Sequence, residues 1–291
     1  MNIIKAFHKQ AARVVVSILG LAAPLSFCPD ASAYPPAPYH LIYGLVRDRY
    51  GTPLASAQAQ IILQPISGPT VSSAVIPGLI PGVNYQIKVP MDSSSTLDLY
   101  QPNVLIAGTS FKVLVVIGTV TNIPIEMTVS NVSLGLPARS TRIDLTLGVD
   151  SNGDGLPDAW EAAFLATLGL NLPLSSINAN SVLTPDGLTL RQQYVLGTYP
   201  FDPDNPLNIL FTGFNNGYPV LQFPTVTGRS YTVLSSADMK NWTPVTFFLA
   251  SDGLNGPART YYYASGISTI QVYVVPPVTG TPAQFYRISV Q

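Results

Sequence analysis

The chain has 291 residues, of which 14 are Lys or Arg and 15 are Asp or Glu, so its formal net charge is −1. This balance excludes a basic nucleic-acid-binding surface, because phosphate contacts require clustered Lys and Arg. Only 10% of the residues are charged, 47% are hydrophobic and 27 are prolines, which indicates a folded, turn-rich, mainly β protein rather than a disordered one.

Residues 1–33 are typical of a secretory signal peptide. Such a peptide has a basic front, a short apolar stretch and a small-residue cleavage site, and this segment has all three: Lys5, Lys9 and Arg13; Val14 to Leu25; and Ala31-Ser-Ala33. The apolar stretch is shorter than the roughly 20 residues that a membrane span requires. We therefore expect a secreted or cell-surface protein, extracellular or periplasmic, that is cleaved near Ala33 and has no membrane span in its mature part.

Cleavage would remove the single cysteine, Cys28, and leave His40 as the only histidine. Lipidation of Cys28 is an alternative, which ranks below simple export because Phe27 is a poor fit to the small residue expected there. After residue 33 the chain keeps 11 Lys and Arg and 14 Asp and Glu, a net charge of about −3. It has no pair of cysteines for a disulfide and no Cys- or His-rich set for zinc or iron.

Residues 34–39, Tyr-Pro-Pro-Ala-Pro-Tyr, predict a stiff, extended leader. Residues 40–148 then alternate short β-rich runs with Pro- and Gly-containing turns, the pattern of a β-sandwich. The predicted strands are Leu41–Asp48, Gln58–Leu63, Asn84–Val89, Ser110–Ile117, Ile123–Val129 and Thr141–Leu147.

The first part of this region resembles a known family. The stretch from Tyr43 to Leu63 contains Gly-Leu-Val-Arg-Asp, then Gly-Thr-Pro-Leu, then Ala-Gln-Ile, and is similar to the first hairpin of carboxypeptidase-regulatory-like domains. Asp48 and Gly51 make a plausible turn, and Pro53 sets the backbone angle for leaving it. The resemblance implies a non-catalytic β-sandwich, immunoglobulin-like in architecture, and supplies no site residue.

A calcium loop is predicted at residues 150–161, Asp-Ser-Asn-Gly-Asp-Gly-Leu-Pro-Asp-Ala-Trp-Glu. Oxygen donors fall at loop positions one, three, five, seven, nine and twelve, with Gly155 at position six for the sharp turn. Position seven offers a backbone carbonyl and position twelve two carboxylate oxygens. The predicted calcium ligands are Asp150, Asn152, Asp154, Leu156, Asp158 and Glu161. The alternative is a solvated Asn-Gly and Asp-Gly turn.

This loop resembles the bacterial thrombospondin type 3 and dockerin-like calcium repeats, which are EF-hand-type motifs of secreted proteins. One departure is Pro157 at position eight, because proline has no N–H for the short strand that pairs two EF-hands. A helix is predicted from Ala159 to Leu168, where apolar residues recur at helical spacing before Gly169.

The segment from Thr184 to Pro200 looks like the second half of the same family's module. With Asp186 at position five, positions one, three and twelve fall on Val182, Thr184 and Gln193, so this half lacks two carboxylates. We therefore expect one competent calcium site and one degenerate half. For Asp186 the preferred interpretation is the N-terminal cap of a helix from Leu188 to Leu196; the alternative is that it turns toward the first ion. Asp202 and Asp204 are either weak ligands or, preferably, part of a Pro-rich exit linker.

From residue 207 the alternating β pattern returns. The predicted strands are Val220–Phe223, Ser230–Leu234, Val245–Leu249, Thr260–Tyr263, Thr269–Val274 and Gln284–Val290. The stretch Ser235-Ser-Ala-Asp-Met-Lys-Asn-Trp-Thr-Pro and the terminal Gln-Phe-Tyr-Arg-Ile-Ser-Val resemble a small C-terminal β-sandwich of exported verrucomicrobial and planctomycete proteins. In that pattern Trp242 is a core anchor.

Two alternatives to a purely structural protein are a glycan-binding protein and an enzyme. Tyr261-Tyr-Tyr263 sends at least one ring toward solvent if it forms a strand, so it is either a glycan-stacking platform or, preferably, cross-strand packing. An enzyme is not predicted, because His40 is the only histidine after residue 33 and no nucleophile-elbow motif accompanies it. Glu161 is assigned to calcium, and Glu126 lies in a predicted strand.

Together these patterns predict a mainly β protein in which two β-sandwich domains are joined by a small helical, EF-hand-like calcium-binding module. The expected boundaries are 1–33 for the signal peptide, 34–39 for the leader, 40–148 for the first sandwich, 149–206 for the calcium module and 207–291 for the second sandwich. The expected function is non-catalytic: Ca²⁺ rigidifies the hinge between the sandwiches. The alternative is a carbohydrate-binding or adhesive module, whose partner is a glycan or a cell-surface protein.

Overall fold

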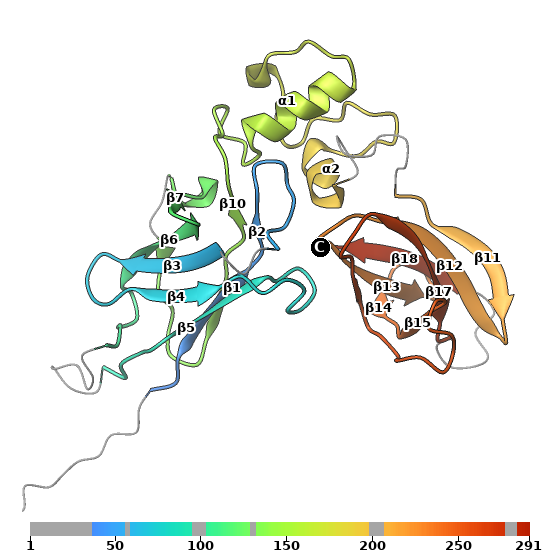
Figure 1. Ribbon diagram of the computed structural model, residues 1–291, viewed down its shortest axis with the longest axis horizontal. Coiled ribbons are helices and arrows are strands. Elements are labelled where there is room, and N and C mark those ends of the chain that lie inside the picture. Colours follow the sequence, from blue (N-terminus) through green and yellow to red (C-terminus); the bar gives the residue numbers. More distant parts are fainter. Residues whose placement is uncertain (1–36, 56–58, 95–102, 129–131, 198–206, 277–283) are drawn as a thin grey trace, which may run out of the picture. The chain divides into compact units, whose positions relative to one another are not determined.

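The computed structural model describes residues 37–55, 59–94, 103–128, 132–197, 207–276 and 284–291. The predicted signal peptide and the first part of the leader lie outside the described residues. The protein is mainly β, with 40% strand and 10% helix, as the sequence predicts. Several sheets and two α-helices are described (Figure 1). Within the described ranges, no helix is long and apolar enough to cross a membrane.

Three sheets are formed by the described residues before the predicted calcium loop (Figure 1). Their orders are β5-β1-β9, β10-β2 and β4-β3-β6-β7, with β8 also paired to β6. The strands are β1 (His40–Gly44), β2 (Val46–Arg47), β3 (Ala59–Pro65), β4 (Val71–Ala74), β5 (Tyr85–Val89), β6 (Ser110–Ile117), β7 (Val120–Asn122), β8 (Val132–Ser133), β9 (Ser140–Arg142) and β10 (Leu145–Thr146).

One hydrophobic core holds these strands together. β3 alternates buried and outward residues along its length, and β6 does the same, because successive side chains of a strand point to opposite faces. The alternation places one apolar face of each strand in the core, which includes Ile42, Ile61, Leu63, Ile87, Phe111, Val113 and Val115, all at most 1% exposed. Burial of this apolar surface is the main favourable term in folding this region.

The turn predicted at Asp48 and Gly51 is confirmed. The Asp48 carboxylate accepts hydrogen bonds from the backbone N–H groups of Tyr50, at 2.8 Å, and Thr52, at 2.9 Å. Gly51 has φ +82° and donates its N–H to the Asp48 carbonyl at 3.0 Å. A Cβ at Gly51 would lie 2.7 Å from Cε2 of Tyr194, so glycine is required here for space as well as for the turn.

The strand predicted at Ile123–Val129 is wrong in its described part. β7 ends at Asn122, and Ile125–Met127 form a 3₁₀ turn, η1, that starts after Pro124. The apolar run misled the prediction because Pro124 lacks an N–H for the ladder and its φ of −62° suits the start of a helical turn. The sequence pattern also missed β4, whose Val-Ser-Ser-Ala carries little apolar signal.

The helical region follows the sequence closely. α1 spans Asp158–Thr167, one residue ahead of its predicted bounds, and Gly169 after it has φ +67°. A short 3₁₀ helix, η2 (Leu174–Ser176), precedes α2 (Leu190–Leu196). The Trp160 ring lies 5.1 Å from the Phe164 ring and 5.3 Å from the Tyr194 ring, so aromatic packing joins the two α-helices. These residues belong to a second core cluster.

Two further sheets are built from the residues after 207, around a third core cluster. Their orders are β11-β12-β17-β15 and β14-β13-β16, with β18 paired to β13. The strands are β11 (Leu210–Asn215), β12 (Tyr218–Thr225), β13 (Ser230–Ser236), β14 (Thr243–Pro244), β15 (Phe247–Leu249), β16 (Tyr262–Tyr263), β17 (Ser268–Val274) and β18 (Phe285–Val290). Strand β11 was missed, since its side chains are mostly exposed and give no alternating pattern.

Trp242 is not the core anchor that the sequence predicts. Its side chain is half-buried, its indole N–H donates to the Met239 carbonyl at 3.2 Å, and the Arg287 guanidinium lies 4.4 Å from its ring centroid. The ring therefore forms a cation–π contact at the surface. The core of this region is built instead from Leu221, Phe223, Tyr231, Val233, Phe247, Ala264, Val272 and Val274.

Arg229 connects three segments that are far apart in the sequence. Its guanidinium is 1% exposed and donates to the carbonyls of Gly51 at 2.8 Å, Val195 at 3.2 Å and Thr227 at 3.2 Å. Burial, and then repulsion from Arg47, lower the pKa of Arg229 to about 10, so the group is still charged at neutral pH. A buried cation must keep its hydrogen bonds, and these acceptors therefore hold the β2–β3 turn, the end of α2 and the β12–β13 turn together.

We predict that Gly197→Ala costs far more stability than Gly169→Ala. Both glycines follow a helix with positive φ, +71° and +67°, so alanine is strained at either position by about 1 kcal/mol. The two sites differ in space: a Cβ at Gly197 would lie 2.1 Å from Cζ of Arg229, whereas a Cβ at Gly169 meets nothing within 4 Å. Urea denaturation should show an additional loss of about 2 kcal/mol or more for Gly197→Ala. Equal losses would mean that Arg229 does not constrain this position.

Candidate metal centre

The predicted calcium loop is held in a tight turn by Asp150. One oxygen of this carboxylate accepts the N–H groups of Gly153 at 2.8 Å and Asp154 at 3.2 Å, and the other accepts the Gly155 N–H at 2.8 Å. Gly153 and Gly155 have φ +74° and +85°, which L side chains rarely adopt. The sequence places glycine at both positions where the backbone needs it, so Asp150 can sit at the centre of the turn.

Two other aspartates also bond to the loop backbone. Asp154 Oδ1 accepts the Leu156 N–H at 2.8 Å, and Asp158 Oδ1 accepts the Ser151 N–H at 2.8 Å. Asp158 is the first residue of α1 and lies in the helix's positive first turn. Oδ2 of Asp158 has no hydrogen bond among the described residues, whereas Oδ2 of Asp154 faces the Asn152 amide.

Five oxygen atoms surround the side-chain nitrogen of Asn152. Nδ2 lies 3.5 Å from Asp154 Oδ2 and 3.5 and 3.4 Å from the two oxygens of Glu161. It lies 3.2 Å from the Leu174 carbonyl oxygen and 3.5 Å from the Ile177 carbonyl oxygen. An amide NH₂ carries only two hydrogens, so it cannot satisfy five acceptors at once. Five oxygens therefore converge on the position of Asn152 Nδ2, and the two hydrogens of this amide can bond at most two of them well.

Glu161 is the most perturbed acid of this group. Its side chain is 0% exposed, on the first turn of α1. Burial, and next the charge of Asp154, raise the pKa of Glu161 to about 7, against the opposing hydrogen bond from Asn152. The carboxylates of Asp158 and Asp150 add to the increase. The site therefore has an excess of negative charge, and a cation in it would favour the ionised form of Glu161.

The six predicted ligands occupy one loop, but the structure does not gather all of them around one point. Within the described ranges, no group of three or more His, Cys, Asp or Glu side chains is arranged to hold a metal ion. Asp150 and Asp158 turn toward backbone N–H groups instead. The two that approach Asn152 are Asp154 and Glu161.

The donor set nevertheless suits calcium. Ca²⁺ takes six to eight oxygen ligands, and carboxylates and backbone carbonyls are the usual ones. The carbonyls of Leu174 and Ile177 come from the segment between the helices and were not predicted from the sequence. A backbone carbonyl leaves no side-chain signature. The only local signal is Pro173, which precedes the 3₁₀ turn that presents the Leu174 carbonyl.

The second half of the module is closed by hydrogen bonds between its own side chains. The Thr184 hydroxyl donates to Asp186 Oδ1 at 2.6 Å, and Gln193 Nε2 donates to Asp186 Oδ2 at 2.7 Å. Positions three, five and twelve of this half therefore contact one another directly. The expected Asp186 cap of α2 is wrong: the N-cap is Thr189, which forms a capping box with Gln192. Asp202 and Asp204 lie outside the described residues.

Comparisons with known proteins find no matching family model, no matching curated protein and no matching solved structure. The interpretation of the loop therefore depends on its own donor set, charge and geometry.

We predict that the ion-free protein loses stability as the pH rises from about 4.5 to about 7, through Glu161. Its folded-state pKa is raised above the ordinary value of 4.5, so its contribution is fully present below pH 4.5 and is lost as the pH passes through about 7. Urea denaturation in chelator should show a decline that is smaller in Glu161→Gln by about 1 to 3 kcal/mol. A parallel pH dependence in the two proteins would contradict this assignment.

Proposed function

We propose that this chain is an exported, non-catalytic structural or interaction protein that binds one calcium ion, and that the ion rigidifies a small helical, EF-hand-like hinge between two β-sandwich domains. The domains would be residues 40–148 and 207–291, and the module residues 149–206. The proposed ligands are those predicted from the sequence, Asp150, Asn152, Asp154, Leu156, Asp158 and Glu161. The second half of the module, around Asp186, would be degenerate.

The observation that supports this function best is the group of five oxygens around Asn152 Nδ2. Three of these oxygens belong to Asp154 and Glu161, at loop positions five and twelve. Burial, and next the charge of Asp154, raise the pKa of Glu161 to about 7, so a cation at this position would offset the cost of ionising it. When bound, Ca²⁺ would supply two positive charges to a loop that holds four carboxylates. A small side-chain rotation of Asp158 would offer its second oxygen, and Asp150 would bind through the remaining lone pair of Oδ2, which among the described residues accepts only the Gly155 N–H.

The packing suggests how an ion at this loop would stiffen the rest of the chain. Glu161 lies on α1 next to Trp160, whose ring contacts Tyr194 of α2 at right angles, at 5.3 Å. The last carbonyls of α2 accept hydrogen bonds from Arg229, which also binds the Gly51 carbonyl. Fixing the first turn of α1 would therefore restrict the motion of α2 and, through Arg229, of residues in both β-rich regions.

A non-catalytic role is supported by the environment of His40. One ring nitrogen lies 2.9 Å from the Leu136 carbonyl oxygen and the other 2.9 Å from the Thr141 hydroxyl. The side chain is 1% exposed, and a Cβ at Gly135 would lie 2.6 Å from its Cε1. A histidine bonded at both nitrogens and enclosed in this way is suited to holding β1 in place rather than to exchanging protons with a substrate.

Calcium titration by calorimetry tests the proposal directly. We expect one site in the wild type, with a dissociation constant of roughly 10⁻⁴ to 10⁻³ M. The double variant Asp154→Ala with Glu161→Gln should lose that site and the rise in melting temperature that calcium gives. Asp252→Asn is a matched control, because this carboxylate pairs with Arg259 on the surface at 3.1 Å and lies outside the loop. No heat in the wild type would reject calcium binding.

The hinge role needs a separate test, since an ion can bind without stiffening anything. Thermolysin digestion of the wild type should be slower with calcium than with chelator in the region around Pro157. If calorimetry shows calcium binding but digestion is equally fast with calcium and with chelator, the calcium site stands and the hinge role is rejected.

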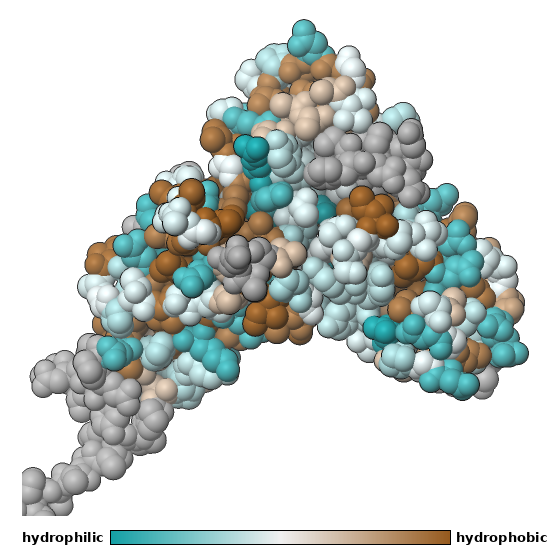
Figure 2. Space-filling view, in the orientation of Figure 1, coloured by the Kyte–Doolittle hydropathy of each residue, from teal (hydrophilic) through white to brown (hydrophobic). Residues whose placement is uncertain are grey.

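The second candidate function is a carbohydrate-binding or adhesive module. The tyrosines proposed for stacking are half-buried: Tyr262 packs on the core, and burial raises the pKa of Tyr263. The aromatic pair that reaches solvent is on β11, where Phe211 and Phe214 are 58% and 70% exposed with ring centroids 5.3 Å apart. Figure 2 shows hydrophobic residues at several places on the visible face, mixed with hydrophilic ones.

A glycan array distinguishes this candidate from the calcium hinge. If the β11 aromatics form the binding surface, wild type should bind a subset of glycans, and Phe211→Ala with Phe214→Ala should lose that binding while it melts at about the same temperature. A uniformly blank array with intact folding would reject the glycan-binding function.

A further inference from the structure

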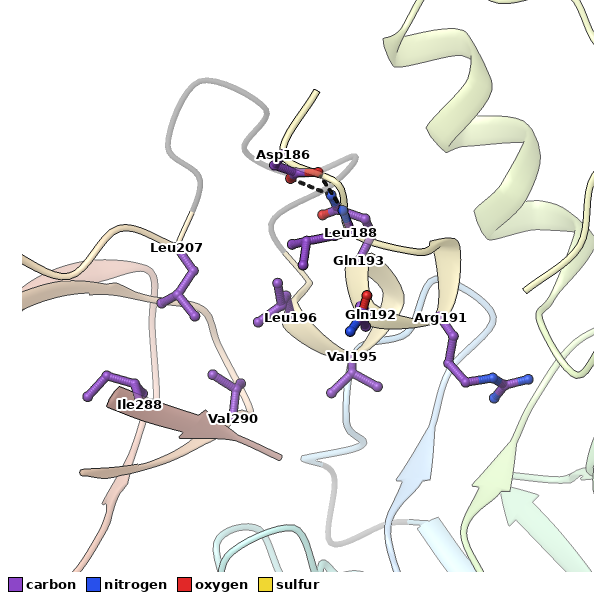
Figure 3. Close-up of a pocket in the computed structure, with 10 residues that line it drawn as sticks. All are labelled: Asp186, Leu188, Arg191, Gln192, Gln193, Val195, Leu196, Leu207, Ile288 and Val290. Atoms are coloured by element: carbon purple, nitrogen blue, oxygen red, sulfur yellow. Dashed lines mark hydrogen bonds between the residues drawn. The ribbon is translucent and has the colours of Figure 1, made fainter. Parts of the chain in front are cut away.

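A pocket of about 570 Å³ lies between α2 and β18 and is not part of the calcium loop (Figure 3). Its volume is in the range of small-molecule sites, roughly 300 to 1,000 Å³. Most of its wall is aliphatic, and its polar residues come from α2 and the turn before it. The wall consists of Leu188, Val195, Leu196, Leu207, Ile288 and Val290, with Asp186, Arg191, Gln192 and Gln193 as its polar members.

Asp186 supplies an anion at one end of this pocket. Burial acts to raise its pKa, but hydrogen bonds from Thr184, the Leu188 N–H and Gln193 outweigh it and lower the pKa below its ordinary value. The group is therefore ionised at neutral pH. Oδ1 accepts from both Thr184 and Leu188, whereas Oδ2 accepts from the Gln193 amide.

Gln193 adds a second negative feature at the same end. The side chain is 1% exposed, and its Oε1 has no hydrogen-bond partner among the described residues. The amide cannot turn over without cost, because Nε2 donates to Asp186 Oδ2 at 2.7 Å and to Thr184 at 3.1 Å. A turned amide would place its oxygen against a carboxylate. A buried acceptor without a donor costs free energy that a positive ligand nearby would offset.

The remaining polar members do not cancel this negative charge. Arg191 extends away from the pocket in Figure 3 and donates to the Asp154 carbonyl at 2.8 Å. Gln192 accepts the Thr189 N–H at 2.9 Å as part of the capping box. The pocket therefore combines an ionised carboxylate and an uncompensated carbonyl dipole with an aliphatic wall.

We propose that this pocket binds an aliphatic primary ammonium, with the charged head at Asp186 and Gln193 and the hydrocarbon chain along the aliphatic wall. An ammonium has three donors and no acceptor, so it complements the negative charge of the Asp186 carboxylate and the dipole of Gln193. An anion would be repelled by Asp186, and a neutral alcohol would lack the charge-assisted bond. The hydrocarbon chain of the ligand would cover the aliphatic wall through apolar contacts with Leu207, Ile288 and Val290. The inference is independent of calcium at the first loop.

The test compares three probes of equal length on the wild-type protein: hexylammonium, hexanol and hexanoate. Binding is followed by the methyl resonances of Ile288 and Val290 in a ¹³C-labelled sample. Hexylammonium should shift these resonances saturably, with an affinity at least about tenfold above that of hexanol. Hexanoate should leave them unchanged. Equal binding of the alcohol, binding of the carboxylate, or no saturable shift with hexylammonium would each overturn the proposal.

Variants then locate the head group. Asp186→Asn should weaken hexylammonium at least about tenfold and should not weaken hexanol. Asp238→Asn is the matched control: its carboxylate also closes a turn, accepting from the backbone N–H groups of Lys240 and Asn241 at 2.8 Å, but it does not line the pocket. The comparison of probes on wild type stands even if Asp186→Asn unfolds. Hexylammonium binding that is unchanged in a folded Asp186→Asn would contradict the assignment.

Two further binding experiments identify the source of the ammonium group and test whether the pocket binds a metal ion instead. A peptide with one lysine, blocked at its N-terminus, tests a protein side chain as the ligand against the free amine. Its acetyl-lysine version should lose binding if the head group is the lysine ammonium. Calcium at millimolar concentration should not displace hexylammonium. Displacement would show that Asp186 and Gln193 form a metal site instead.

Discussion

Two buried charges, one at each end of the helical module, impose the main constraint on this structure. Glu161 lies in the first turn of α1 beside other carboxylates, and Arg229 lies against the end of α2. The cation is satisfied by backbone carbonyls from three segments, whereas the anion faces an amide nitrogen that has more acceptors around it than hydrogens to give. Burying a charge is costly unless its bonds are made. The hydrogen bonds of Arg229 at the end of α2 are therefore made, whereas the acidic group around Glu161 at the start of α1 is suited to receive a cation.

This difference explains why the two halves of the helical region lead to different proposals. In the second half the pairs Thr184–Asp186 and Gln193–Asp186 close the turn with neutral donors. In the first half the corresponding positions carry Asn152, Asp154 and Glu161, two of them acidic. Asp186 is thus bonded within its own turn, and it lines the pocket beside α2. Under the proposed function, the first half would gain more from a divalent cation because it holds more carboxylates.

The sequence predicted the features that depend on local chemistry. α1 was placed to within one residue, because Trp160, Phe164 and Leu165 recur at helical spacing and Gly169 ends the pattern. The Asp48 turn was found because Asp and Gly have distinct turn roles. The strand pairings, Arg229 and the carbonyls of Leu174 and Ile177 were not found. These features arise from contacts across long separations, and neither the backbone oxygens nor a single arginine leaves a periodic trace.

The parallel pairing of β1 with β9 has a consequence for how the chain folds during synthesis. Ile42 is paired with Thr141, so β1 has its antiparallel neighbour, β5, after about 45 residues but its parallel neighbour only after about 100. At roughly 5 to 20 residues per second, the parallel edge of β1 stays open for several seconds after β5 has been made. An unpaired strand edge is a template for pairing with another chain, so in that interval β1 is open to mispairing.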